Sequence, residues 1–297
     1  MKESPPDLII VAVKTPFLPR VIQDLLQVVT KDTLFLSHQN GIGTEGLLSK
    51  EFGESAVFRS VINYGGNMVR PGIIKMTFFT PPNYLGSLTN INSENGLAIA
   101  ELFSRAGLPT EFDQNYPQSV WKKAILNSSL SGLCAVTHMT MKEAMAFNDT
   151  HDMVENLVKE GINVGTGLGI SFEESFFEHC MNYLSNGGNH KPSMLYDLEN
   201  RLQTEVEFLN QKIVENGRVF GIPTPYNEAV TSIIKGLDFI NERTRIYIKE
   251  KAKAMGMHVR CNSCKYVLDC IDTLTYCPID GQLIPTKAPN PQNTEER

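Results

Sequence analysis

The chain has 297 residues, of which 41% are hydrophobic and 20% are charged, and its formal net charge is −6. This composition is too apolar for a disordered chain, and a length near 300 predicts two domains of about 150 residues each. The acidic balance excludes a protein that an overall positive charge draws to nucleic acid or to an anionic membrane.

The first residues carry no export signal. The segment MKESPPD places two acids and two prolines where a signal peptide needs a basic start and a long apolar stretch. The longest apolar run, residues 8–13, is far shorter than the roughly 20 residues that span a bilayer. We therefore expect a cytoplasmic protein with no membrane partner.

Strands and helices are expected to alternate over the first hundred residues. Residues 8–14, LIIVAVK, form a continuous apolar run, which is typical of a strand buried on both faces of a parallel sheet. The alternation that follows predicts an α/β fold with parallel strands. We expect strands at residues 8–14, 33–41, 57–66, 73–79 and 84–88, and helices from Pro19, over about 44–52, and from Ser93 to Gly107.

From about residue 115 the pattern changes to long amphipathic helices, which predicts a second, all-helical domain. The clearest helix starts near Pro192 and Ser193, carries apolar residues at three- and four-residue spacing, and ends before Gly217 or Gly221. At more than twenty residues, this helix is expected to form the spine of the domain. A last helix is expected over about 226–255.

The segment VWKKAILNSSLSGL, residues 120–133, spaces three polar residues four positions apart: Lys123, Asn127 and Ser131. On a helix they form one polar stripe. A lysine and an amide on such a stripe suit a cleft that holds a carbonyl and a carboxylate, because the lysine supplies a charge and a proton and the amide supplies hydrogen bonds. The alternative is a solvated helix face with an ordinary surface lysine.

Glu205 falls inside the apolar stripe of the long predicted helix, three residues after Leu202 and four before Leu209. Burying a carboxylate without a partner costs several kcal/mol, so one interpretation pairs Glu205 with a lysine, a ligand hydroxyl or the other domain. The alternative is a carboxylate that reaches solvent from the edge of the stripe.

The segment QNGIGTEG, residues 39–46, lies between a predicted strand and a predicted helix and contains the closely spaced glycines Gly41 and Gly43. We do not interpret it as a G-x-G-x-x-G turn, so it gives only weak support for a phosphate cradle. Asn40 stands at the carboxyl end of the strand, where open α/β sheets bind their ligands. A plain turn explains the segment equally well.

Four of the six cysteines fall between residues 261 and 277. Cys261 and Cys264 form one short knuckle, and the second knuckle, which begins with Cys277, has Asp280 in place of a cysteine. Two such knuckles brought together by a hairpin predict a zinc ribbon with a structural metal. Asp280, or less favourably Cys270, would be the fourth ligand; the alternative is a small β-hairpin with reduced cysteines.

The same region holds a modest basic cluster. Two lysines and an arginine follow the lysine at residue 249, and a further lysine stands at residue 265. A nucleic-acid contact would use such a cluster. A solvated helix end explains it as well, and we do not expect a nucleic-acid partner.

Several blocks of the sequence resemble the ketopantoate reductase (2-dehydropantoate 2-reductase) family, and the resemblance covers about residues 7–255. The order and spacing of the blocks also match those of the family. The blocks are DLIIVAVKT at 7–15, SHQNGIGTEGLL at 37–48, NYGG at 63–66, VWKKAILN at 120–127 and PSMLYDLENRLQTEVEFLNQKIVENGRVFGIPTP at 192–225.

This resemblance implies an activity and a site. The family transfers a hydride from NADPH to the keto carbonyl of a 2-oxo acid, and it makes pantoate from ketopantoate for pantothenate and coenzyme A biosynthesis. Lys123 matches the family's catalytic proton donor. The resemblance places the 2-oxo acid against Asn127, Ser131 and Ser193, and the NADP cofactor against Lys14, Asn40, Gly66 and Glu205.

The chain departs from the family pattern in two places. The family opens with a strand, a G-x-G-x-x-G turn and a first βαβ unit of roughly 60 residues, and this chain begins at the strand that should follow. The second departure lies in the substrate pocket. Ser131 and His190 stand where the family usually has asparagines, and Met141 replaces another, which leaves open a 2-oxo acid other than ketopantoate.

The expected fold class is therefore α/β, in four parts. These are a truncated Rossmann-like parallel-sheet domain at 1–114, a helical substrate and dimerisation domain at 115–256, a zinc-ribbon-like module at 257–286 and a polar tail at 287–297. The helical domain is the candidate site of homodimer contacts.

Two functions stay open. The first is an NADP-dependent oxidoreductase acting on a 2-oxo acid, which the retained Lys123, Asn127, Ser193 and Glu205 favour. The second is a non-catalytic binding or regulatory protein, which the missing phosphate-binding turn favours.

Overall fold

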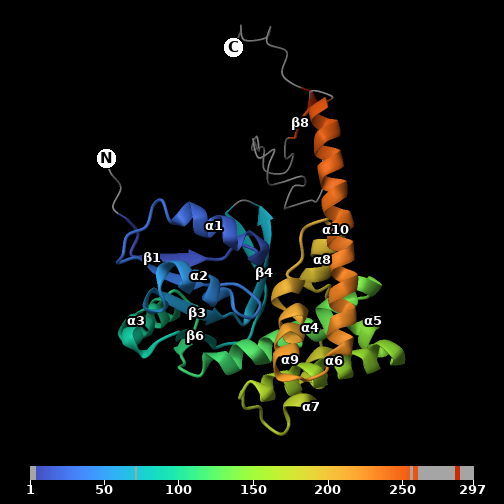
Figure 1. Cartoon of the computed structure of the whole chain (residues 1–297), viewed down its shortest axis with the longest axis horizontal. Helices are drawn as coiled ribbons and strands as arrows, with labels where there is room; N and C mark the ends of the chain where they lie inside the picture. Colours follow the sequence, from blue (N-terminus) through green and yellow to red (C-terminus); the bar gives the residue numbers. More distant parts are fainter. Residues whose placement is uncertain (1–4, 71, 255–256, 260–284, 288–297) are drawn as a thin grey trace.

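The computed structural model describes residues 5–70, 72–254, 257–259 and 285–287. In Figure 1 the N-terminal third forms a sheet with helices against it, and the remaining helices gather beside this part. The longest helix, α10 (Pro225–Ala254), runs through the helical part and extends beyond it. An α/β part followed by a helical part is thus confirmed.

The sheet consists of β1 (Leu8–Val11), β2 (Leu34–Ser37), β3 (Val57–Val61), β6 (Asn83–Ser87) and β7 (Thr110–Phe112), in that order. The pairs β1–β2, β2–β3 and β6–β7 are parallel, as expected. The pair β3–β6 is antiparallel, so the prediction of an all-parallel sheet is wrong here. Antiparallel neighbours need no crossover helix, and only a ribbon lies between these two strands.

That ribbon consists of β4 (Tyr64–Arg70) and β5 (Ile73–Phe79), which pair with each other and not with the sheet. The strand predicted at 57–66 is therefore two strands that separate at Asn63. The backbone of Asn63 closes the base of the ribbon, because its N–H donates to Asn83 Oδ1 at 2.8 Å and its carbonyl accepts from the N–H of Thr80 at 2.8 Å.

Helices cover both faces of the sheet. α1 (Leu18–Leu25) and α2 (Thr44–Phe52) contribute Leu18 and Leu48 to a buried cluster with Phe35 of β2. The next residue of β2, Leu36, belongs to a second cluster with Ile99 of the helix on the opposite face. This alternation follows from the two-residue period of a strand. The helix on that opposite face is α3 (Ser93–Arg105).

The helical part is arranged around α4 (Tyr116–Thr137), which packs against helices on several sides and against the sheet. Its apolar residues are shared between two clusters, with Ile125 in one and Ala124 in the other. α4 therefore takes the central position that the sequence assigned to a later segment. The other helices are α5 (Met141–Ala146), α6 (Asn148–Gly167), α7 (Phe176–Ser185), α8 (Ser193–Glu199) and α9 (Asn210–Phe220).

The long helix predicted from Ser193 to Gly217 or Gly221 is wrong as a single element. The structure divides it into α8, a 3-10 turn η4 (Val206–Phe208) and α9. The chain leaves the helix at Arg201, which has φ of 53°. Thr204 is then held by Asp238 of α10 through its hydroxyl at 2.6 Å and its N–H at 3.3 Å. These tertiary hydrogen bonds outweigh the helical periodicity of the segment.

Two short strands, β8 (Met257–Val259) and β9 (Pro285–Lys287), pair antiparallel after α10. The predicted zinc ligands Cys261, Cys264, Cys277 and Asp280, with the alternative Cys270, lie outside the described residues. Within the described ranges, no group of three or more His, Cys, Asp or Glu side chains could hold a metal ion. None of the helices described is both long and apolar enough to cross a membrane.

Candidate active site

The predicted polar stripe lies on one helix, α4. Lys123 and Asn127 are half-buried and Ser131 is buried, and all three come from a helix whose other faces are packed. The ammonium of Lys123 donates a hydrogen bond to the carbonyl of Ile62, just beyond the end of β3. The stripe therefore faces the sheet at Lys123 and not open solvent.

Lys123 is electrostatically unusual for a lysine. Burial lowers its pKa to about 7, and the positive charge of Arg59 acts in the same direction, while the carboxylate of Glu205 raises it. A lysine of this kind holds a proton that it can give up near neutral pH, whereas an ordinary surface lysine keeps its proton until about pH 10.

His38, at the carboxyl end of β2, stands next to this lysine and was not predicted as a site residue. Its Nδ1 lies 2.7 Å from Ser60 Oγ and its Nε2 lies 2.7 Å from the hydroxyl of Tyr64. Ser60 Oγ donates its proton to the carbonyl of Ser37. We infer that His38 donates from Nδ1 and that the Tyr64 hydroxyl donates to Nε2.

His38 is held in its neutral form. Burial lowers its pKa to about 4, and the charges of Lys123 and Arg59 lower it as well. It therefore joins β2, β3 and the base of the ribbon as an uncharged link, and it adds no charge that would compete with Lys123.

Lys14 and Glu205 meet where the sheet and the helical part join. Lys14 Nζ lies 2.6 Å from Asp197 Oδ2 of α8 and 3.7 Å from Glu205 Oε2. Glu205 is 6% exposed and accepts hydrogen bonds from the N–H of Thr15 at 3.1 Å and from its hydroxyl at 2.9 Å. Of the two interpretations of Glu205, the buried and paired one is correct, although the residue lies at the start of η4 and not inside a helix.

Asp197 is a second buried carboxylate that sequence reasoning missed. Burial raises its pKa to about 6, against the lowering effect of Lys14. Its Oδ1 is buried without a hydrogen-bond partner among the described residues. Asp197 comes four residues after Ser193 in the block PSMLYDLE, so its position on α8 was the one available signal.

The turn 40–46 lies beside Lys14 and Thr15, since the Thr15 hydroxyl is 3.4 Å from the carbonyl of Asn40. The spacing of Gly41, Gly43 and Gly46 matches G-x-G-x-x-G between a strand and a helix, so the interpretation of this segment as lacking that motif is wrong.

Two backbone groups of this turn are already occupied. The N–H of Ile42 donates to the carbonyl of Phe208 at 2.8 Å, and the carbonyl of Gly41 accepts from Arg59 at 2.8 Å. Glu45 adds a negative charge to the first turn of α2, which disfavours a phosphate there. We therefore assign the turn to domain packing and to the placement of Asn40, and not to a pyrophosphate cradle.

Two predicted residues lie at the margin of this cluster. Gly66 is exposed in the ribbon, where it pairs with Met76. Ser193 is exposed as the first residue of α8. Hydrogen bonds and ion pairs link Lys14, Asn40 and Glu205 through Thr15, and Glu205 also acts on the charge of Lys123. None of these interactions among the described residues includes Gly66 or Ser193.

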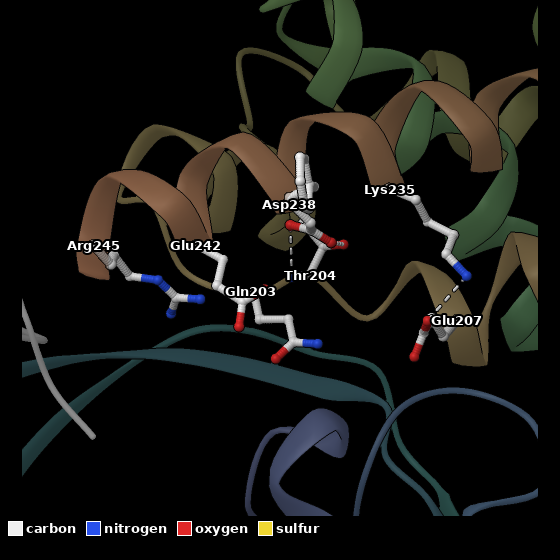
Figure 2. Close-up of a pocket in the computed structure, with 8 residues that line it drawn as sticks. Gln203, Thr204, Glu207, Lys235, Asp238, Glu242 and Arg245 are labelled. Atoms are coloured by element: carbon white, nitrogen blue, oxygen red, sulfur yellow. Dashed lines mark hydrogen bonds and ion pairs between the residues drawn. The ribbon is translucent and has the colours of Figure 1, made fainter. Parts of the chain in front are cut away.

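A separate pocket lies between the segment leading to η4 and the outer face of α10. Figure 2 shows Thr204 bonded to Asp238, and Lys235 paired with Glu207 at 3.1 Å. None of the predicted site residues lines it. Glu205 bonds instead to Thr15, so neighbouring residues of this segment contact different parts of the protein: Thr204 and Glu207 line the pocket, and Glu205 contacts the chain after β1.

The cluster offers groups that a nicotinamide nucleotide could use. Lys14 is a cation with a side chain 39% exposed, Asn40 follows the end of a parallel strand, and Asp197 Oδ1 has an unused acceptor. Asn127 takes part in no side-chain hydrogen bond within the described ranges. Asn40 stands at the carboxyl end of a parallel strand, where open α/β sheets bind ligands, and the four groups together fit a ribose hydroxyl and a carboxamide or carboxylate.

The chain is similar to known proteins over most of its length. Residues 1–90 match the family model described as "Ketopantoate reductase PanE/ApbA", and residues 115–238 match "Ketopantoate reductase PanE/ApbA C terminal". The 2-dehydropantoate 2-reductase of Streptococcus pyogenes serotype M3 is 30% identical over 230 residues, which cover 77% of this chain and 75% of that protein.

Solved structures show the same fold. A structure of D-mandelate dehydrogenase with NADH and anilino(oxo)acetate has a TM-score of 0.72 and 27% identity, and the match covers 80% of this chain and 77% of that one. A dimeric ketopantoate reductase from Staphylococcus aureus has a TM-score of 0.68 and 22% identity over 79% and 78% of the two chains. The chain therefore belongs to the ketopantoate reductase family, a family of oxidoreductases.

Proposed function

We propose that this protein reduces a 2-oxo acid to the corresponding 2-hydroxy acid with NADPH, and that Lys123 supplies the proton. The observation that carries the proposal is the position of Lys123: an ammonium buried on a polar stripe, with its pKa lowered to about 7, beside the residues that could hold the cofactor. The nicotinamide, when bound, supplies the hydride.

The chain's own residues divide the remaining work. The ammonium of Lys123 is placed to protonate the developing alkoxide, and a proton donor with a pKa near the working pH is effective in this role. Asn127, one turn further along α4, and Ser131, two turns further, would hold the substrate carboxylate or side chain. Lys14, Asn40 and Glu205 would hold the nucleoside, as the family resemblance implies, with Asp197 fixing the position of Lys14.

The proposed substrates differ in the side chain of the 2-oxo acid. Relatives are named 2-dehydropantoate 2-reductase, which supports ketopantoate as the first acid to test. Ser131 is smaller than asparagine, and a related dehydrogenase has been solved with the aromatic analogue anilino(oxo)acetate and NADH. We therefore include larger 2-oxo acids in the proposal, and NADH as the competing cofactor.

The deciding experiment starts with titration of NADPH and NADH, followed by fluorescence or by the shift in melting temperature. A panel of 2-oxo acids, from ketopantoate to phenylglyoxylate, is then assayed for oxidation of the bound cofactor. We expect Lys123→Ala to lose at least a hundredfold in kcat while it still binds the cofactor, in line with general acid catalysis.

Lys122→Ala is the matched control, because Lys122 is the adjacent residue of α4 and forms a surface ion pair with Glu173 at 2.6 Å. It should keep wild-type turnover. Full activity of Lys123→Ala would contradict the assigned proton donor. A folded wild-type chain that binds neither cofactor would contradict the reductase and favour a binding protein.

We also propose that the helical part forms a homodimer through α10. Phe239 and Ile240 are more than half exposed, and Ile246 and Tyr247 continue the apolar surface along the same helix. Light scattering at several concentrations tests this, and a monomer throughout would contradict it.

A further inference from the structure

Arg59 is a buried arginine in β3, the middle strand of the sheet, and it is 2% exposed. Its guanidinium donates to Thr44 Oγ1 at 2.7 Å, to Ser37 Oγ at 3.2 Å and to the carbonyl of Gly41 at 2.8 Å. These bonds join the end of β2, the turn after it and the start of α2. Arg59 therefore holds the 40–46 turn in place.

That turn contacts both the segment that carries Glu205 and the segment that carries Thr15. Gly41 and Ile42 contact Phe208, beyond Glu205, and Asn40 lies beside Thr15. A change at Arg59 would be transmitted to the positions of Asn40 and Glu205 through the backbone of the turn.

The charge of Arg59 is only partly compensated. The one carboxylate within ion-pair distance, among the described residues, is Glu45, whose Oε2 lies 3.6 Å from Nε, and Nε has no hydrogen-bond partner. Tyr116, two turns before Lys123 on α4, and Glu205 also interact with this charge. Lys123 donates to the carbonyl of Ile62, three residues after Arg59, so β3 and α4 bring these two cations into one region.

We propose that Arg59 is a positioning residue of the site: it fixes the turn that carries Asn40, and its buried guanidinium acts on the Lys123 ammonium at the end of β3. This rests on the proposed function only in the role given to Lys123. The planar fork of arginine suits the holding of the turn because it binds three oxygens at fixed angles. Any buried cation would have the same electrostatic effect on Lys123.

Charged or titratable groups from several elements interact with Lys123. Arg59 of β3 lowers the pKa of Lys123 and Glu205 at η4 raises it, while His38, which follows β2, is itself held neutral by burial and by the charges of Lys123 and Arg59. Removal of the Arg59 charge therefore leaves Glu205 as the dominant neighbour, and Lys123 should hold its proton to higher pH.

The test measures the protonation of Lys123 directly, without turnover. The holoprotein is labelled with acetic anhydride over a range of pH, and the extent of acetylation at Lys123 is read by mass spectrometry, with Lys122 as the internal reference. In Arg59→Met the midpoint should move to higher pH by about one unit or more, the size typical of one nearby charge. In Arg59→Lys, which keeps the charge, the midpoint should stay close to that of the wild type.

Thr44→Val separates the holding of the turn from the effect of charge on Lys123. It removes the hydroxyl that lies 2.7 Å from the Arg59 guanidinium and leaves the Arg59 charge in place. It should weaken cofactor binding severalfold with no change in the labelling midpoint. A folded Arg59→Met with an unchanged midpoint would overturn the proposal, as would an Arg59→Lys midpoint that moves as far as that of Arg59→Met.

Should Arg59→Met fail to fold, Glu45→Gln provides the electrostatic test. This change removes the counter-charge 3.6 Å from Arg59, so the Lys123 midpoint should fall, and an unchanged midpoint would overturn the proposal. Failure of the wild type to reduce any 2-oxo acid would contradict the proposed function alone, because the labelling experiment does not depend on turnover.

Discussion

Thr15 and Glu205 lie 190 residues apart in the chain and are joined by two hydrogen bonds, from the Thr15 N–H at 3.1 Å and from its hydroxyl at 2.9 Å, to the same carboxylate oxygen. Thr15 follows β1 and Glu205 begins η4, so the bonds join the sheet to the helical part. The two donors of Thr15 offset part of the cost of burying this carboxylate at the junction.

Thr15→Val should therefore destabilise the protein although the two side chains have the same shape. The change removes one charge-assisted hydrogen bond to a buried carboxylate, which costs about 1.5–3 kcal/mol of unfolding free energy. Urea denaturation followed by circular dichroism measures the difference. Thr166→Val, at an exposed position of α6, is the control and should change the midpoint little. Equal effects of the two substitutions would contradict the role given to the Thr15 hydroxyl.

Gly41 and Gly43 provide a matched pair for the turn. Both have positive φ, 94° and 80°, but a Cβ at Gly41 would lie 2.7 Å from Phe208 Cβ and 2.8 Å from its carbonyl oxygen, whereas a Cβ at Gly43 would meet nothing within 4 Å. Gly43→Ala should cost only the backbone strain of about 1 kcal/mol. Gly41→Ala should cost markedly more and should weaken cofactor binding, because the turn must move away from the helical part. Similar stabilities of the two variants would contradict the proposed contact.

The sequence was informative where one helix or one strand carried the signal. The stripe of Lys123, Asn127 and Ser131 could be predicted because all three residues lie on α4, and a four-residue period survives in any helix. For Glu205 the apolar neighbours on both sides left a buried and a solvent-exposed carboxylate open, and only the structure decides for the buried one. The prediction that Glu205 lies inside a helix is wrong because the bonds of Thr204 to Asp238 break the helix. Such long-range bonds leave no trace in local periodicity.

The residues that sequence reasoning missed act through partners far along the chain. Arg59 bonds to groups 15 to 22 positions away, His38 to residues 22 and 26 positions away, and Asp197 to Lys14 at a separation of 183. An arginine or a histidine in a strand is ordinary in sequence. Only the fold shows that these two are buried beside Lys123, because the order of β1, β2 and β3 decides which side chains meet.

Lys123→Met should make the folded protein more stable. Below about pH 7 the folded state carries a buried ammonium, which is costly, and above that pH the folded lysine loses its proton while the unfolded lysine keeps it to about 10.5. The unfolded state binds more protons in this window, so wild-type stability should rise from pH 7 towards pH 10.

Lys123→Met removes both the cost of burying the ammonium and the rise of unfolding free energy with pH. A gain of about 1–3 kcal/mol at pH 7 is expected, as is common when a strained functional group is replaced. Urea denaturation at pH 7 and pH 9 measures both quantities, and Lys122→Met provides the surface control. A variant less stable than the wild type at pH 7, with the same slope, would show that Lys123 is not held as described.

The ion pair of Lys14 and Asp197 predicts an asymmetry between its two partners. Their atoms lie 2.6 Å apart, but the Lys14 side chain is 39% exposed and the Asp197 side chain only 2%. Asp197→Asn leaves a lysine that water and Glu205 can still stabilise, so the loss should stay below about 1 kcal/mol. Lys14→Met leaves a buried carboxylate with no close cation, and the loss should be about 2–4 kcal/mol at pH 7.

Lowering the pH should reduce the loss of stability caused by Lys14→Met. Because burial raises the pKa of Asp197 to about 6, above that of the unfolded chain, the folded state binds more protons between about pH 4 and pH 6, and protonation there stabilises it. Removal of the Lys14 charge moves this window to higher pH. The difference in unfolding free energy between Lys14→Met and the wild type should therefore shrink from pH 7 to pH 5. A difference that stays constant over this range, or a larger loss in Asp197→Asn than in Lys14→Met, would show that Asp197 is not the buried partner of the pair.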